Sequence, residues 1–187
     1  MQTSTMTWPC TSQGSRAVFA PEQSFDRTRM RRLMEGQTAV LHCHHYATLF
    51  TQLALDAEQF NGPALLARAA AEAFGGQLRD YLSTHGITEP WDRIAIAEQY
   101  FAFMGFGEMK FECSQNRAAV TMRHSHIDEG WKRKWGQRRE PLNYVGCGYI
   151  QGAIAAIYDL REAQMVTVRE TQSIVCGATS SKFEVTW

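Results

Sequence analysis

The chain has 187 residues, of which 44% are hydrophobic, and its 19 Lys and Arg residues are balanced by 19 Asp and Glu residues. This length and composition predict one globular domain with a core large enough to fold without disulfide support. The formal net charge of zero argues against the broad basic surface that is typical of nucleic-acid-binding proteins.

The cysteines and the apolar stretches indicate the cellular environment. Five cysteines at wide spacings, with no Cys-x-x-Cys pair, argue against a disulfide scaffold. The first residues are polar and lack the apolar core of a signal peptide, and no apolar stretch is long enough to span a membrane. We therefore expect a protein of the reducing cytoplasm.

Helical patterns dominate the first half of the chain. Residues 1–24 are rich in Ser, Thr and Gln and predict an extended or mobile segment. Apolar residues at helical spacing follow, separated by Gly-containing breaks. The expected helices span residues 26–35, 37–60, 63–83 and 91–104.

From Gly105 onward the pattern becomes strand-like. Alternation over 109–113 and 118–126 predicts a hairpin. A polar loop over 127–142, a helix over 146–159 and a terminal hairpin between 166 and 187 follow. Because the helices come first, we expect an α+β fold, with residues 25–187 as one domain and four strands in one antiparallel sheet.

The C-terminal block resembles a known family. Gly148-Tyr149, Gly152, Glu170-Thr171, Gly177 and Phe183-Glu184-Val185 resemble the end of the 4-vinyl reductase domain. The resemblance covers residues 105–187 and implies a small-ligand-binding α+β module. Its fold is similar to that of the transport-particle subunits of the eukaryotic Golgi. Members of the family often pair, so the resemblance also implies a homodimer.

The resemblance further implies a zinc ion held by one Glu and three Cys. Two of those Cys fall at Ser173 and Ser181 of this chain, and the third falls near Asn143. Cys147 and Cys176 are close by but out of register. The usual zinc site is therefore not carried over.

The densest group of potential metal ligands is the run His-Cys-His-His at residues 42–45. Two of its histidines lie one helical turn apart, and strand 118–126 carries two more on one face. If strand and helix pack together, these imidazoles and a carboxylate would form a mononuclear zinc or iron site. The alternative is that they are hydrogen-bonded residues of the core or its rim. The predicted ligands are His42, His45, His124, His126 and Glu129, with Asp128 as an alternative carboxylate.

Two residues are candidates for catalysis. Cys43 is either a nucleophile or ligand, or a small buried hydrophobe. Glu98 lies in an apolar helix, where a buried carboxylate must be paired or have a raised pKa. It is either a general base or ligand anchor, or a residue at a helix edge that faces water.

The ligand site is predicted from aromatic residues around the Gly-rich start of helix 146–159, which suit a flat ligand or a dimer surface equally. We place the pocket between helix 37–60, strand 118–126 and helix 146–159. Gly148 would leave room there, so Gly148→Leu should abolish ligand or metal uptake and spare the fold. The predicted ligand-binding residues are Tyr46, Phe50, Trp131, Asn143, Tyr144, Gly148 and Tyr149.

Common nucleotide-binding and hydrolase motifs are absent from the sequence. We expect a protein that binds a small apolar or aromatic molecule and acts as a sensor, carrier or accessory factor. One alternative is a metal-dependent enzyme that uses the histidines, since the chain's end also resembles L-2-aminothiazoline-4-carboxylate hydrolases more weakly. A second alternative is a structural assembly subunit.

Overall fold

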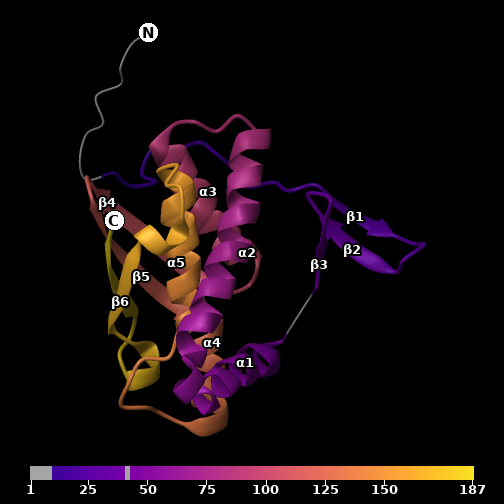
Figure 1. Ribbon diagram of the computed structural model, residues 1–187. Coiled ribbons are helices and arrows are strands. Elements are labelled where there is room, and N and C mark those ends of the chain that lie inside the picture. Colours follow the sequence, from indigo (N-terminus) through magenta and orange to yellow (C-terminus); the bar gives the residue numbers. More distant parts are fainter. Residues whose placement is uncertain (1–9, 41–42) are drawn as a thin grey trace.

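The computed structural model describes residues 10–40 and 43–187 and shows helices with two antiparallel sheets, which confirms the α+β class (Figure 1). The strands are β1 (Gln23–Asp26), β2 (Arg31–Met34), β3 (Gln37–Ala39), β4 (Gly107–Ser114), β5 (Arg117–Ser125), β6 (Thr167–Gln172) and β7 (Ser181–Thr186). The helices are α1 (His44–Asp56), α2 (Gly62–Thr84), α3 (Pro90–Phe103), α4 (His126–Trp135) and α5 (Tyr144–Ile157). Short 3-10 helices are η1 (Glu58–Phe60), η2 (Ala163–Met165) and η3 (Ile174–Cys176). No helix of the described residues is long and apolar enough to span a membrane.

The larger sheet has the strand order β4-β5-β7-β6 and joins the two predicted hairpins. Its alternating pattern places one set of side chains in the core, where Phe111, Val120 and Phe183 are register neighbours on adjacent strands. Glu112 and Glu184 lie on the opposite, exposed face. The helices therefore cover one face of this sheet, as predicted.

Helix α5 is buried between this sheet and α2 (Figure 1). A Cβ built on Gly152 would lie 2.9 Å from the Cα of Gly75 on α2, and one built on Gly148 would overlap the carbonyl oxygen of Ala67. These glycines let two helix backbones approach closely. The predicted role of Gly148 is corrected: it packs against α2 and leaves no space for a ligand.

The smaller sheet, β1-β2-β3, replaces the helix predicted over 26–35 and projects from the body of the molecule (Figure 1). The carboxylate of Asp26 accepts the N–H groups of Thr28 at 3.0 Å and Arg29 at 3.1 Å, so it closes a turn instead of capping a helix. Glu35 and Gly36 both have positive φ and form the two-residue turn between β2 and β3.

Two other expected elements also differ. The helix predicted over 37–60 begins only at His44, because β3 occupies its first residues. The polar loop predicted over 127–142 contains α4, in which Ile127 and Trp131 are buried. The hydroxyl of Ser125 caps this helix by accepting the N–H of Asp128 at 3.1 Å.

The segment that precedes the smaller sheet lies against α3. The hydroxyl of Ser12 donates to Glu98 at 2.7 Å, and that of Ser15 donates to Asp92 at 2.6 Å. Phe19 is buried, with its ring 4.6 Å from that of Tyr81. From residue 10 onward the expected lead over 1–24 thus contacts α2 and α3, and residues 1–9 lie outside the described residues.

Candidate ligand-binding site

An apolar hollow of about 510 Å³ lies beneath α1. Its walls come from the end of β3, from α1, α2, α4 and α5, and from the residue before β4. Its volume and apolar lining are typical of small-molecule sites. This apolar hollow is lined by Val40, Tyr46, Ala47, Phe50, Leu66, Phe106, Ile127 and Val145.

Small side chains on α1 allow it to pack closely on α4. Thr48 and Thr51 are buried, and their hydroxyls donate to carbonyl oxygens one turn earlier, at 2.8 and 2.9 Å. On α4, a Cβ added to Gly130 would lie 3.0 Å from the Cβ of His44. The neighbouring Ala47 faces the hollow, so this close helix contact adjoins its wall.

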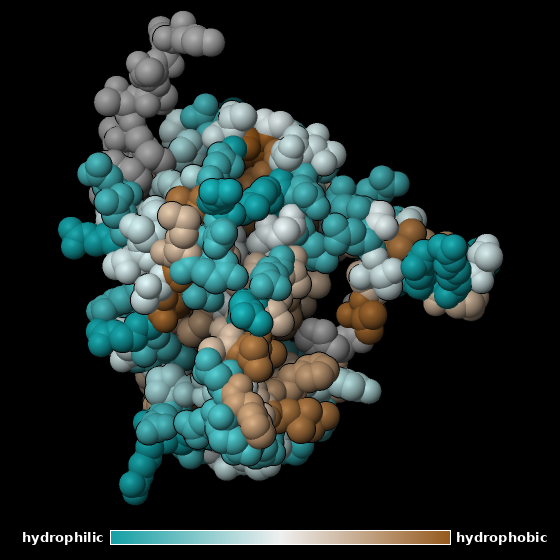
Figure 2. Space-filling view, in the orientation of Figure 1, coloured by the Kyte–Doolittle hydropathy of each residue, from teal (hydrophilic) through white to brown (hydrophobic). Residues whose placement is uncertain are grey.

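The hollow opens to the surface at α1. The side chains of Tyr46 and Phe50 line it but are 57% and 53% exposed, and their ring centroids are 6.4 Å apart. Figure 2 shows hydrophobic residues gathered over this lower part of the molecule. A large exposed apolar patch is typical of a binding surface.

A set of buried polar groups ties α4 and α5 together beside the hollow. The amide nitrogen of Asn143 donates to Asp128 at 2.9 Å and to Ser125 at 3.0 Å, and its amide oxygen accepts the N–H of Gly146. Ile127 and Val145 lie close to these bonds in sequence and line the hollow, so the bonds fix two of its walls. This polar junction consists of Ser125, Asp128, Asn143, Glu170, Ser173 and Ser181.

Burial dominates the electrostatics of the polar junction. It raises the pKa of Asp128, and it raises the pKa of Glu170 to about 7, with the charge of Asp128 adding to the shift. The hydroxyls of Ser173 and Ser181 and the backbone N–H of Asn143 lower the pKa of Glu170 in part. The Ser173 hydroxyl is near enough for this effect, yet it makes no hydrogen bond of ordinary geometry within the described chain.

The predicted shared face of His124 and His126 is wrong. A β-bulge between Glu108 and Met109 leaves Arg123 as an extra residue, which turns His124 outward. The His124 side chain is 71% exposed and lies 3.5 Å from the carboxylate of Glu129. His126 belongs to α4 and not to the strand.

The other histidines meet at the start of α1. The ring of His44 lies 4.1 Å from that of His45 and 5.9 Å from that of His126. Desolvation, followed by the neighbouring His45 and Arg133, lowers the pKa of His44. No three His, Cys, Asp or Glu residues in the described ranges are placed to hold a metal ion, and His42 lies outside those ranges. The structure thus gives the predicted metal site no support.

The two catalytic candidates lie apart from the hollow's lining. Cys43 is exposed, with its sulfur 3.7 Å from Nδ1 of His45, so it is not a buried hydrophobe. Glu98 is buried and does not face water. Its carboxylate accepts hydrogen bonds from Lys110 at 2.6 Å and the N–H of Phe111 at 3.0 Å, and so joins α3 to β4.

The predicted ligand-binding residues divide into two groups. Tyr46 and Phe50 line the hollow. The others have structural contacts elsewhere: Trp131 packs on Trp135 at 4.4 Å, and the buried hydroxyl of Tyr149 donates to a backbone carbonyl of α3. Tyr144 is half-buried, at the first residue of α5.

Six further residues of the lining were not identified from the sequence. Their side chains are Val, Ala, Leu, Phe and Ile, types that any helix stripe or core position carries, so a single sequence gives no signal for them. Phe106 alone stands between two glycines, and this break in the pattern marked the helix end. The missed residues are Val40, Ala47, Leu66, Phe106, Ile127 and Val145.

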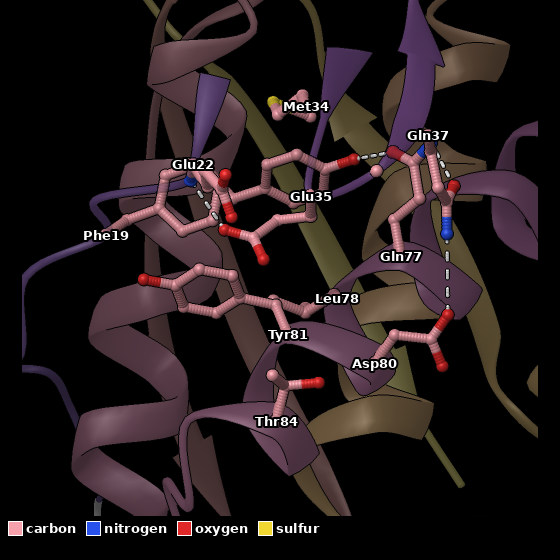
Figure 3. Close-up of a pocket in the computed structure, with 12 residues that line it drawn as sticks. Phe19, Glu22, Met34, Glu35, Gln37, Gln77, Leu78, Asp80, Tyr81 and Thr84 are labelled. Carbon is pink, nitrogen blue, oxygen red and sulfur yellow. Dashed lines mark hydrogen bonds between the residues drawn. The ribbon is translucent and has the colours of Figure 1, made fainter. Parts of the chain in front are cut away.

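A second, more polar hollow of about 380 Å³ lies where the smaller sheet meets α2 and α3 (Figure 3). Tyr81 forms part of its floor. Glu35 accepts the N–H of Glu22 at 2.7 Å, and Asp80 accepts from the amide of Gln37 at 3.5 Å. The contact of Gln37 with Asp80 connects the projecting sheet to α2, whereas that of Glu22 with Glu35 lies within the sheet region.

No family model matches the chain, and no curated protein matches it. Two solved structures share its fold at 12% identity. The phenol-responsive sensory domain of the transcription activator PoxR, solved with phenol, has a TM-score of 0.71, covering 88% of this chain and 84% of that one. Trafficking protein particle complex subunit 3 of Naegleria fowleri, covalently bound to palmitic acid, has a TM-score of 0.50, covering 76% of this chain and 93% of that one.

Proposed function

We propose that this protein binds a small apolar or aromatic molecule in the apolar hollow and acts as a sensor, carrier or accessory factor. The observation that carries the proposal is the hollow itself, a space of about 510 Å³ with aliphatic and aromatic walls. The phenol and the palmitic acid in the two structural neighbours support it, because both are molecules of this chemical class.

The lining also suggests what kind of ligand enters. Among the described residues, the lining contains no ionisable side chain other than the phenol group of Tyr46. A charged ligand would lose its hydration there without gaining a partner, which is costly. We therefore propose a neutral ligand with a ring or short chain and at most one or two polar groups, one of which reaches Tyr46.

Isothermal titration with phenol, and with 1-octanol as a longer neutral apolar probe, tests the proposal. Ala47→Phe should fill the hollow and reduce affinity at least tenfold, because Ala47 lines it. Ala73→Phe is the matched control, since Ala73 is an exposed alanine of α2 that does not line the hollow. Equal binding by the two variants, or no binding of any small neutral aromatic by the wild type, would overturn the proposal.

We further propose that the protein forms a homodimer through the face of α1. Tyr46, Leu49 and Leu53 of this helix are exposed large hydrophobic residues. The projecting three-stranded sheet contacts the body through the buried Met34 and a few polar contacts, while Phe25 and Met30 of its β1–β2 hairpin are exposed. A second copy could cover both the exposed face of α1 and these residues.

A further inference from the structure

The polar junction occupies the place where the zinc site of the resembled family would be expected. Ser173 and Ser181 fall at two of the family's Cys positions, and Asn143 falls near the third. The structure brings these three residues and Glu170 together although they come from β6, the segment after it, β7 and the N-cap of α5. The position is thus preserved in space while the ligand types differ.

The residues present do not fit zinc. Zinc in proteins takes thiolate, imidazole and carboxylate ligands, in structural sites almost always four of them. Serine hydroxyls and a carboxamide are neutral oxygen donors, which suit harder ions better. No trio of His, Cys, Asp and Glu in the part of the chain that the structure describes is placed to hold a metal ion.

The nearby thiols do not complete a set. Cys147 and Cys176 are free thiols near the junction, but neither belongs to a set of three His, Cys, Asp or Glu residues that is placed to hold a metal ion within the described ranges.

Two sets of hydrogen bonds hold the elements around the junction. Asn143 joins α5 to the first turn of α4 through Asp128 and to the end of β5 through Ser125. The hydroxyl of Ser181, the first residue of β7, accepts the N–H of Ile174 at 3.0 Å and holds the loop between β6 and β7. Asn143, Ser125, Asp128 and Ser181 are each at most 2% exposed.

We infer that this chain closes the junction of β6, β7, α4 and α5 without a metal ion, by the hydrogen bonds of Asn143 to Ser125 and Asp128 and by that of Ser181 with the N–H of Ile174. The inference does not depend on the proposed ligand, since it concerns how the fold is held together.

The first test measures metal content and its effect on stability. The untagged chain, expressed with added zinc, should carry less than about 0.1 zinc per chain by plasma mass spectrometry. A strong chelator should leave its melting temperature unchanged. One zinc per chain, or a fall of several degrees on chelation, would overturn the inference.

The second test restores thiols. Ser173→Cys combined with Ser181→Cys places two thiols beside Glu170, and this variant should gain about one zinc and a melting temperature that a chelator lowers. Thr171→Cys combined with Thr179→Cys is the control, because it adds two thiols at exposed positions of the same segments. If the Ser173/Ser181 variant takes up no more zinc than the control, residue identity at the junction is not what excludes the metal.

Discussion

Single glycines decide how closely α2 and α5 pack. A Cβ on Gly75 would lie 2.9 Å from the Cα of Gly152, whereas a Cβ on the adjacent Gly76 would meet nothing within 4 Å. The two residues have the same helical neighbours and differ only in the face that they occupy. Substituting each glycine therefore measures two effects separately: the cost of a glycine within a helix, and the close contact between α2 and α5 that Gly75 allows.

We predict opposite effects from the same substitution at these two positions. Gly76→Ala should raise the free energy of unfolding by about 1 kcal/mol, because alanine favours the helix and has room there. Gly75→Ala should lower it by about 1–3 kcal/mol, because the added methyl group forces the helices apart. Urea unfolding measures both. Gly148→Leu should fail to fold, and a folded, stable Gly148→Leu protein would contradict this packing.

Asn143 is the residue with most contacts in the polar junction. Asn143→Ala removes the cap of α5 and the amide that donates to the buried Asp128, so it should cost about 2–4 kcal/mol of stability. Because Asn143 also fixes the spacing of Ile127 and Val145, affinity for a ligand in the hollow should fall as well. Asn116→Ala, in an exposed turn, is the control for stability and binding. An Asn143→Ala variant with unchanged stability and unchanged affinity would contradict the proposed role of the polar junction.

The raised pKa of Glu170 predicts a pH dependence of stability. Its pKa is about 7 in the folded protein and about 4.5 ordinarily, so between these values the folded chain holds a proton that the unfolded chain has released. This contribution is fully present below pH 4.5 and is lost as the pH rises through 7. The slope is at most about 1.4 kcal/mol per pH unit.

Glu170→Gln should flatten this decline, since glutamine cannot ionise, and Glu112→Gln on the exposed face of the sheet should keep it. Unfolding by urea at pH values from 4.5 to 8 measures the effect. Identical slopes for the two variants would show that Glu170 is not the group responsible.

At the scale of helices and strands, the sequence predicted the elements that show a regular apolar spacing over many residues. The helices expected over 63–83, 91–104 and 146–159 and both hairpins of the larger sheet are present. The prediction of a helix over 26–35 was wrong because Asp26 can start either a helix or a tight turn. Only the pairing of β1 with β2 favours the turn. Helix α4 was missed because its sequence is strongly polar on one face.

The site was predicted in part, and the reasons are again physical. Tyr46 and Phe50 belong to a helical stripe that the sequence shows. The prediction that the histidines converge assumed that side chains alternate along β5 without a break. A bulge that leaves Arg123 unpaired interrupts this alternation, so the prediction fails. A one-residue shift reverses the facing of every later side chain, and nothing in the sequence of one strand reveals its partner's register.

The exposed face of α1 predicts an effect on oligomeric state. Leu49→Glu combined with Leu53→Glu should convert a dimer into a monomer, because burying two carboxylates in an apolar interface is unfavourable. Light scattering after size exclusion should give twice the 21.2 kDa chain mass for the wild type and 21.2 kDa for the variant. Gln59→Glu, an exposed charge near the end of the same segment, should stay dimeric. A monomeric wild type at 100 µM would contradict the proposed interface.

For the whole molecule, the apolar hollow is where the separate parts of the fold meet. Its walls come from α1, α2, α4 and α5 and from the ends of strands in both sheets. The polar junction fixes the α4 and α5 walls, and the apolar mouth lies on the face proposed for the dimer. A ligand in the hollow would therefore contact α1, α2, α4 and α5. A shift of these helices on binding would also move the face proposed for the dimer.

We expect an apolar ligand to occupy this hollow and not the more polar one beside Tyr81. A crystal of the protein grown with 4-bromophenol tests it directly, because the bromine gives an anomalous signal that locates the ring. We predict one strong peak between Phe50, Phe106 and Val145. A peak only beside Tyr81 and Asp80, or no ordered bromine at saturating ligand, would contradict the account.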